Sequence, residues 1–174
     1  MPLWKIQKNW DIIADTVVES NLFQKSNSAS TRRIFREIRQ RLQNLDEQTL
    51  EDFDQFTRDE QKIVLLIAAC KCYPFLFDFI QTVLANKLMV FDHHLKQEDF
   101  DAFWNRSQVD YPELEKIADS TRKKIRQVTF RLLAEAGLLS STQTPQITPI
   151  QFPATIEGVL QREGEIYRGA LLIS

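Results

Sequence analysis

Two segments of the chain open with the same residue types. Residues 30–33 read Ser-Thr-Arg-Arg, and residues 120–124 read Ser-Thr-Arg-Lys-Lys. Each opens a stretch of helical period, so the Ser/Thr pair is expected to cap a helix. A helix N-terminus carries about half a unit of positive charge and free N–H groups, and Arg or Lys there costs about a few tenths of a kcal/mol. The cap, the free amides and the cations together suit a phosphate, which predicts a polyanion-binding protein.

The helical period spreads these cations over two helix faces. At about 100° per residue, Arg32, Arg36 and Arg39 fall on one flank of the first helix, and Lys123 and Arg131 share a face of the second. Such residues bind the phosphate backbone, and no reading head with Asn or Gln at base-reading positions is visible, so little sequence preference is expected. The predicted nucleic-acid-binding residues are Ser30, Thr31, Arg32, Arg33, Arg36, Arg39, Ser120, Thr121, Arg122, Lys123, Lys124, Arg126 and Arg131.

The charge of the whole chain hides this pattern. The net charge is -2, with a pI of about 5.8. Residues 28–45 nevertheless hold five Arg against one Glu, and residues 120–134 hold five Lys/Arg and no acid. Residues 46–60 hold seven Asp/Glu against one Arg. An acidic protein can therefore carry a basic face, although the basic residues could instead pair with the acidic 46–60 segment.

Other residue types that could do chemistry lack the partners they need. The adjacent His93 and His94 cannot share a helix face, and a metal site needs three or four convergent ligands. Cys70 and Cys72 lie on an apolar run without a second Cys pair, as expected of core thiols in a reduced cytosolic protein. The first 136 residues contain no glycine, which excludes a Walker loop or a GxGxxG fingerprint there. The sequence predicts no enzyme, metal, cofactor or small-molecule substrate.

The elements that carry these residues are expected to be helices. The 174 residues have ordinary globular composition, and the missing glycines exclude most hairpin turns. The longest apolar run, residues 63–70, is far shorter than the ~20 residues of a spanning helix, so it predicts a buried core helix. With no signal peptide visible, a cytoplasmic protein is expected. The predicted helices are about Trp10–Ser20 after the cap Asn9, Thr31–Asn44, Thr49–Phe56, the helix from the capping box of Thr57 and Glu60 to Tyr73, Pro74–Leu88, Gln97–Arg106, Pro112–Ala118 and the helix from Ser120 to Gly137.

The last of these helices has two candidate core contacts. Ile125, Val128, Leu132 and Ala136 form its predicted core stripe, with the cations on the opposite face. Phe130 falls on the polar side, where a second core contact is favoured over an exposed ring for base stacking.

The C-terminal part changes character. Three prolines, at positions 145, 149 and 153, predict an extended arm, followed by a helix over about residues 155–162. Residues 146–148 could instead pair with residues 150–152 as a small hairpin. The whole is expected to be an all-α, compact multi-helix bundle, with an N-terminal lobe (1–57), a main helical lobe (58–140) and the C-terminal arm (141–174).

Several motifs resemble those of a known family. Residues 21–25 read Asn-Leu-Phe-Gln-Lys, residues 30–34 read Ser-Thr-Arg-Arg-Ile, and residues 120–139 run from Ser-Thr-Arg-Lys-Lys-Ile-Arg-Gln-Val to Leu-Ala-Glu-Ala-Gly-Leu-Leu. Together they resemble the BrxA family, a small component of the BREX bacteriophage-exclusion systems. The resemblance spans about residues 9–140 and implies an all-helical fold related to NusB, with DNA binding of little sequence preference.

The predicted function combines the residues with the resemblance. It is that of a non-enzymatic accessory protein of phage defence that binds double-stranded DNA through phosphates. Other BREX proteins are possible partners, and no membrane is expected. Two alternatives stay open: an assembly adaptor whose basic face docks an acidic surface of another BREX protein, and, by analogy with NusB, an RNA-binding protein.

Overall fold

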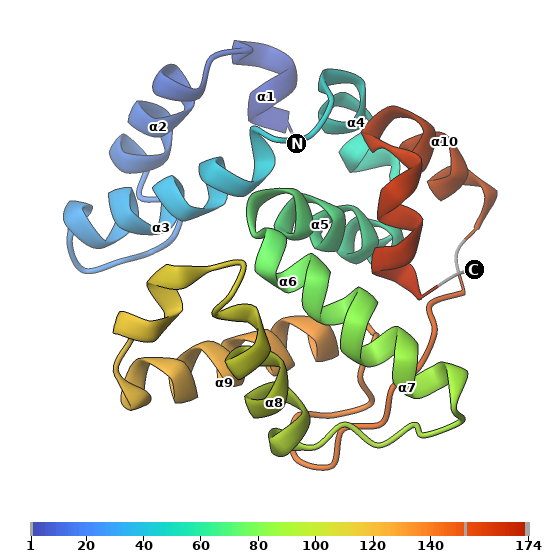
Figure 1. Cartoon of the computed structure of the whole chain (residues 1–174). Coiled ribbons are helices and arrows are strands. Elements are labelled where there is room, and N and C mark those ends of the chain that lie inside the picture. The colour runs from blue at the N-terminus through green and yellow to red at the C-terminus, as the bar shows by residue number, and fades with distance from the viewer. Residues whose placement is uncertain (1, 152, 173–174) are drawn as a thin grey trace.

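The structure is all helical over the residues it describes, as the sequence predicts. The computed structural model describes residues 2–151 and 153–172, and no strand occurs within these ranges. Helices cross one another in a compact bundle (Figure 1). In chain order they are α1 (Pro2–Gln7), α2 (Trp10–Glu19), α3 (Ser28–Leu42), α4 (Glu47–Asp52), the 3₁₀ turn η1 (Phe53–Gln55), α5 (Arg58–Cys72), α6 (Pro74–Phe79), the π-helical turn η2 (Ile80–Leu84), α7 (Ala85–Met89), α8 (Gln97–Ser107), the 3₁₀ segment η3 (Pro112–Lys116), α9 (Asp119–Glu135), α10 (Ala154–Glu163) and the 3₁₀ segment η4 (Glu165–Leu171).

Helix α5 lies at the centre of the molecule (Figure 1). The predicted capping box opens it: Thr57 Oγ1 accepts the Glu60 N–H at 3.3 Å, and a Glu60 carboxylate oxygen accepts the Thr57 N–H at 2.7 Å. Its residues from Ile63 to Cys70 are buried except Leu65, which confirms a core helix. Burial raises the pKa of the Cys70 thiol to about 12, so that thiol stays protonated and unreactive.

Helices α6, α8 and α9 enclose an aromatic cluster. The ring of Phe79 lies 5.4 Å from that of Phe100 and 6.4 Å from that of Phe130, and Phe75 packs on Phe103 and Trp104 at 4.9 and 5.6 Å. The predicted core contact of Phe130 is thereby confirmed.

The predicted core stripe of α9 is only partly right. The buried residues of this helix are Thr129, Phe130 and Leu133. Val128 is 37% exposed, and the other members of the predicted stripe are half-buried. The helical period of α9 was predicted correctly, but the buried face is the neighbouring one, because Phe130 packs in the aromatic cluster.

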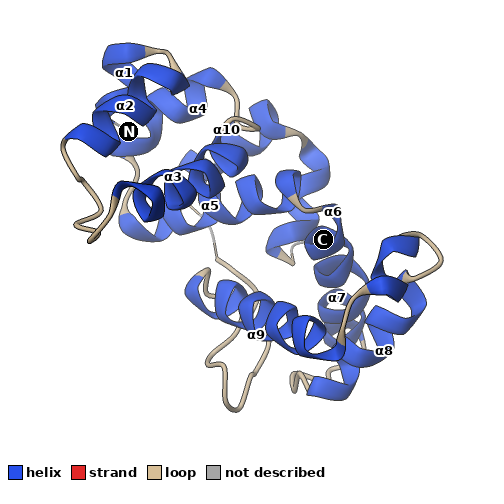
Figure 2. Cartoon of the chain, turned by 90° about the vertical axis from the view of Figure 1, so that its left-hand side faces the viewer, coloured by secondary structure: helices blue, strands red, loops and turns tan. Residues whose placement is uncertain are grey.

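The N-terminal helices share a small core of their own. Asn9 caps α2 as predicted, with its side-chain oxygen accepting the Asp11 and Ile12 N–H groups. Ile13 and Val17 pack against Phe35 of α3. Figure 2 shows α1 to α4 at one end of the molecule and α8 and α9 at the other. The proposed division at residues 57 and 140 stays a prediction.

The C-terminal arm is extended, as its prolines predict. It meets the rest of the chain through single bridges, from Gln146 to His94 and from Ile147 to Leu139. Residues 146 and 147 thus pair with earlier segments, so the alternative of a local hairpin is wrong; Phe152, at its far end, lies outside the described residues. The predicted last helix is present as α10, where the carboxylate of Glu163 accepts hydrogen bonds from Lys71 Nζ at 2.7 Å and from the Asp46 N–H at 3.0 Å.

No single helix in the described ranges is both long and apolar enough to cross a lipid bilayer. Only α5 taken together with the α6–α7 segment reaches that length and composition, and these two segments are bent by 113°.

Candidate nucleic-acid interface

The first predicted opening lies inside a helix and does not cap it. Helix α3 begins three residues before Thr31, and its cap is Asn27, whose side-chain oxygen accepts the Ser30 N–H at 2.8 Å. The Thr31 N–H bonds the Asn27 carbonyl at 3.4 Å, and the Thr31 side chain is buried. The predicted cap at Ser30 is therefore wrong, because Asn27 in extended conformation satisfies the amides that were expected to be free.

The second opening differs from its prediction in the same way. Helix α9 begins at Asp119, after the extended residue Ala118, which offers no side-chain cap. The Thr121 and Arg122 N–H groups bond the Ala118 carbonyl at 2.9 and 3.0 Å, and Asp119 supplies the negative charge that a first helical turn favours. Ser120 thus lies in the first turn, and the predicted cap at Ser120 is wrong too, while phosphate binding at this helix start stays a prediction.

The arginine flank of α3 is present where the spacing places it. Arg32, Arg36 and Arg39 line one shallow hollow of about 190 Å³ between α3 and α2. Arg32 and Arg36 are exposed, as is Arg33, and within the described ranges no carboxylate approaches any of these three to ion-pair distance. Arg39 differs, since its Nη1 lies 2.6 Å from Asp11 Oδ1 of α2.

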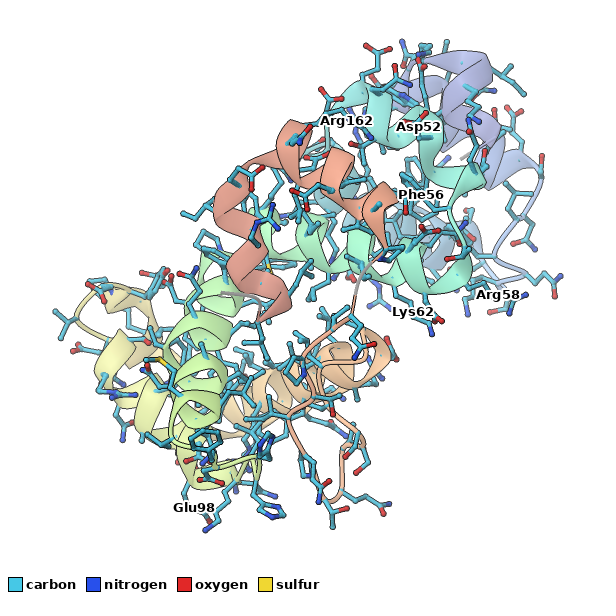
Figure 3. The ribbon with its side chains drawn as sticks, turned by 90° about the vertical axis from the view of Figure 1, so that its right-hand side faces the viewer. Asp52, Phe56, Arg58, Lys62, Glu98 and Arg162 are labelled. Atoms are coloured by element: carbon cyan, nitrogen blue, oxygen red, sulfur yellow. The ribbon has the colours of Figure 1, made fainter. Side chains whose placement is uncertain are left out.

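The acidic 46–60 segment finds its cations elsewhere. Lys8 pairs with Glu47 at 2.7 Å and also with Glu51. Arg162 of α10 lies 3.3 Å from Asp52, and Figure 3 shows these two side chains facing each other. The partners in these ion pairs are Lys8 and Arg162, and no arginine of the α3 flank takes part in them.

The cations of α9 divide into two groups. Arg126 donates from Nη1 to both Asp101 carboxylate oxygens at 3.0 Å, and Arg122 reaches the same carboxylate at 3.0 Å while its guanidinium lies 5.7 Å from the centre of the Trp104 ring. Two predicted binding residues therefore hold α9 against α8. Lys123, Lys124 and Arg131 are exposed, with Lys124 Nζ bonded to Gln127 at 3.0 Å and Arg131 Nε 3.8 Å from Glu135. The exposed group keeps its charge available for a ligand.

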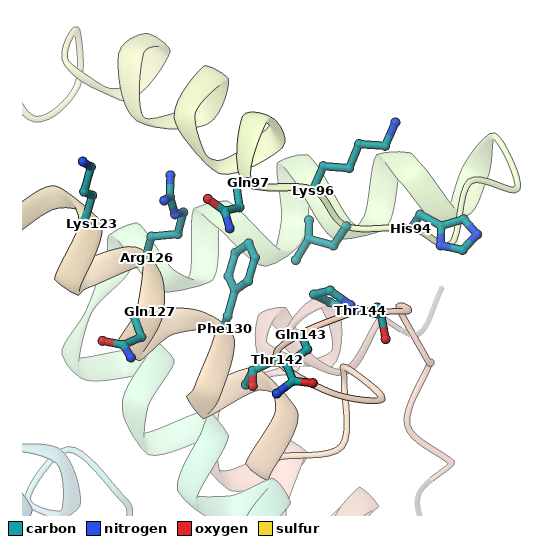
Figure 4. A pocket seen from close by; sticks show the side chains of 12 residues that line it. His94, Lys96, Gln97, Lys123, Arg126, Gln127, Phe130, Thr142, Gln143 and Thr144 are labelled. Carbon is teal, nitrogen blue, oxygen red and sulfur yellow. The ribbon is translucent and has the colours of Figure 1, made fainter.

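A hollow of about 540 Å³, lined by both polar and apolar side chains, adjoins Lys123 of the exposed group. Lys123 and Arg126 lie on its α9 side, Lys96 and Gln97 at the start of α8, and residues 142–144 of the arm below them (Figure 4). The sequence did not single out Lys96, since a lone lysine between elements carries no periodic signal.

His93 and His94 each take part in a polar contact that involves a backbone group. Asp92 Oδ2 lies 2.6 Å from Lys87 Nζ, its other oxygen accepts the His94 N–H at 3.0 Å, and His93 Nδ1 lies 3.3 Å from the Ile147 carbonyl oxygen. Across the residues that the structure describes, no three His, Cys, Asp or Glu side chains gather as metal ligands would.

The two openings turn toward different neighbours, α2 for the first and α8 for the second. Further along, however, the two helices meet the same part of α5: Arg41 of α3, Lys62 of α5 and Arg131 of α9 line one groove. In Figures 1 and 2 α3 lies above α9, and α5 lies beside both. Sequence reasoning missed Arg41 and Lys62, because each lies beside the apolar stripe of its helix and outside the two motifs.

Comparison with known proteins agrees with the family motifs. The chain is 24% identical to a "BREX protein BrxA" of Bacillus cereus over 129 residues, which are 74% of this chain and 64% of that protein. It is also 24% identical to a "BREX protein BrxA" of Escherichia coli over 151 residues, 87% of this chain and 71% of that protein. The chain thus spans somewhat less than two thirds of the Bacillus protein's length.

The fold is found in a solved structure as well. The crystal structure of an uncharacterized protein from Magnetospirillum magneticum superposes with a TM-score of 0.75, covering 94% of this chain and 90% of that one, at 18% identity. The BrxA family model matches residues 1–164. The family model over residues 1–164 and the two relatives show that the chain belongs to the BrxA family.

Proposed function

We propose that this chain is a non-enzymatic accessory protein of a BREX phage-defence system and binds duplex DNA through its phosphate backbone. The observation that carries the proposal is the set of Arg32, Arg33 and Arg36 in the first half of α3, which are exposed and form no ion pair with any residue that the structure describes. Their guanidinium groups are hydrated and take part in no ion pair among the described residues, so their charge is available to phosphate. The names of the two relatives supply the phage-defence context.

The site works through counterion release. Each phosphate neutralised by Arg or Lys releases condensed cations, which gives about 0.9 in the log–log salt slope per contact on duplex DNA. The three arginines of α3 alone would give a slope of about -2.7. Adding Lys123 and Lys124 of α9 raises the contacts to five and the slope to about -4.5. The slope therefore reports whether both basic helices touch one duplex.

Specificity should be low. The exposed cations lie on a helix flank that is bounded by α2. None of the proposed binding residues is of a type and position that would read base edges, and contacts to phosphate carry no sequence information. Every duplex sequence should bind with nearly the same affinity.

The test is charge reversal on α3. The double variant Arg32→Glu/Arg36→Glu should weaken binding of a labelled duplex of about two helical turns to all sequences alike and lower the slope by about two contacts. The matched control is Arg58→Glu/Arg106→Glu, which changes the net charge equally at exposed positions outside the proposed site; Figure 3 labels Arg58 at the start of α5. Arg39 is spared because its substitution would also break the ion pair with Asp11.

The measurement is fluorescence anisotropy over a salt series with duplex DNA, single-stranded DNA and RNA. Equal affinity of both double variants and the unmodified protein at low salt would remove α3 from the site. Absence of binding to any nucleic acid at low salt would contradict the proposal and favour an assembly adaptor. Strong preference for RNA would contradict the choice of DNA.

A further inference from the structure

An uncovered groove runs along α5 between α3 and α9. It has a volume of about 380 Å³. Apolar side chains from all three helices form its walls and floor: Ile38 and Leu42 of α3, Leu65, Leu66 and Ala69 of α5, and Val128 and Leu132 of α9. We refer to it as the α5 groove.

The apolar stripes that meet in the α5 groove lack a covering helix. Helix α5 is apolar all round, a composition typical of a helix buried on every side. Leu65 is nevertheless 43% exposed, while Val64 and Leu66 beside it are at most 1% exposed. On α9, Val128 belongs to a stripe of helical period and is 37% exposed. Two helices thus present stripes of core character that no helix among the described residues covers, the geometry of a groove that receives an amphipathic helix.

The charges around the groove select an acidic occupant. Three cations line it, Arg41, Lys62 and Arg131, against one acid, Glu135. Lys62 Nζ also lies 2.7 Å from Asp59 Oδ1, so these residues together leave a charge of +1, from three minus two. Arg131 lies 3.8 Å from Glu135, a distance that leaves its hydrogen-bonding capacity largely unused.

Arg41 adds a second observation. Its guanidinium lies 5.5 Å from the centre of the Tyr73 ring, and its Nε is buried with no hydrogen-bond partner among the described residues. The Nε atom itself is buried, so Arg41 contributes to the groove through the positive charge of its guanidinium. A guanidinium favours a carboxylate above other acceptors.

Two other occupants fit less well. In a two-fold dimer through this groove the same patch would face itself, so Arg41, Lys62 and Arg131 would approach their own copies and repel them. A DNA phosphate gains hydrogen bonds from a rim cation, but it gains nothing from the apolar floor formed by Leu65 and Val128. An apolar floor inside a cationic rim matches a protein helix better than either.

We propose that the α5 groove binds an acidic amphipathic helix of a partner protein. The stripe from Val128 to Ala136 is about 12 Å long at 1.5 Å per residue, which matches about two turns of the partner. The partner helix carries apolar residues at positions i, i+3 or i+4, and i+7, with Asp or Glu on the flanks. This interaction is separate from DNA binding and does not depend on it.

The test is a selection on the full chain. A library of displayed, helix-biased peptides of about 16 residues is selected for binding to the unmodified protein. The enrichment of each peptide is then compared with its enrichment on the variant Leu65→Ser/Val128→Ser. The matched control is Ile12→Ser/Ile166→Ser, two exposed apolar residues outside the groove. Thermal melts show that all variants are folded. Enriched peptides should combine the apolar period with flanking carboxylates and bind the groove variant at least about tenfold more weakly than the control.

A charge variant keeps the proposal testable if the serine variant loses stability. Lys62→Glu should reduce the affinity of the same peptides and remove the preference for carboxylates over the corresponding amides. Enriched peptides without acidic flanks, or no enrichment over the groove variant, would overturn the proposal. So would a loss of duplex DNA affinity in Leu65→Ser/Val128→Ser, which would assign the groove to nucleic acid, or a dimer that dissociates in that variant.

Discussion

Asp101 of α8 decides whether two arginines of α9 serve the fold or a ligand. Its carboxylate binds Arg126 through both oxygens at 3.0 Å and Arg122 through one at 3.0 Å. The substitution Asp101→Asn keeps the size of the side chain and removes its charge. Two opposite effects are expected: lower stability, because the anchor of α9 on α8 loses its charge, and tighter DNA binding, because two guanidinium groups lose their carboxylate. Arg122 keeps its hydrogen bond to the Asp101 backbone carbonyl at 3.2 Å.

The size of the stability effect follows from the contacts. Hydrogen bonds to charged groups contribute about 1.5–3 kcal/mol each when buried. The side chains here are 17–38% exposed, so solvent screening reduces this to about 1 kcal/mol per arginine and roughly 2 kcal/mol in all. For a chain of this length that corresponds to a decrease in Tm of about 4–8 °C. On DNA, two additional phosphate contacts would steepen the salt slope by about 1.8.

Thermal unfolding by circular dichroism and a salt series on duplex DNA measure the two effects. Asp110→Asn, an exposed acid in the turn after α8, makes the same change of charge without touching an arginine and serves as the control. Equal Tm values for the two variants would refute a stabilising role of Asp101. A lower Tm with an unchanged slope would show that Arg122 and Arg126 stay away from DNA even when released.

Three further outcomes test the core and the helix ends. The pKa of Glu60 is lowered, first by the hydroxyl of Thr155 and then by the N–H and hydroxyl of Thr57. Its ionised form therefore stabilises the fold above the ordinary carboxyl pKa of 4.5, and this contribution is lost as the pH falls through the lowered pKa. In urea titrations at a series of pH values, Glu60→Gln should reduce the loss of unfolding free energy on acidification. Gly137→Ala should cost about 1–2 kcal/mol in chemical unfolding, because φ is +89° while nothing within 4 Å obstructs a Cβ. Leu133→Ala should cost about 2–5 kcal/mol and Val128→Ala less than about 1 kcal/mol, a ranking opposite to that expected from the predicted stripe.

Local rules were sufficient for most of the helical framework. The capping box of Thr57 and Glu60 and the cap at Asn9 each depend on residues within four positions, and each occurs as predicted. Phe130 was also placed correctly, since an aromatic ring on a polar face is more stable when a second packing partner covers it.

The two Ser-Thr-Arg openings show where local rules fail. Both Asn27 and Ala118 lie a few residues upstream, and each starts its helix early enough to place the Ser/Thr pair within the first turn. Asn27 could have been found from sequence, because Asn is at least as good an N-cap as Ser. Ala118 could not, since its role comes from its extended backbone after η3 and from Asp119 in the following turn.

Whether each cation is paired or exposed depends on residues far from it in the sequence, which a local pattern does not contain. Arg39 and Arg126 lie in stretches of equal basicity to those of Arg36 and Lys123, yet the first two meet Asp11 and Asp101 while the second two meet solvent. Those acids belong to other helices, and only the packing of α2 on α3 and of α8 on α9 brings them within reach. A local charge count therefore sets an upper limit on the cations available for phosphate, and the long-range ion pairs lower it. Arg131 is exposed as well, so the two basic helices offer six cations and a salt slope of at most about -5.4. With Arg39, Arg122 and Arg126 engaged in ion pairs, a steeper slope from these two helices would require one of those pairs to open on DNA.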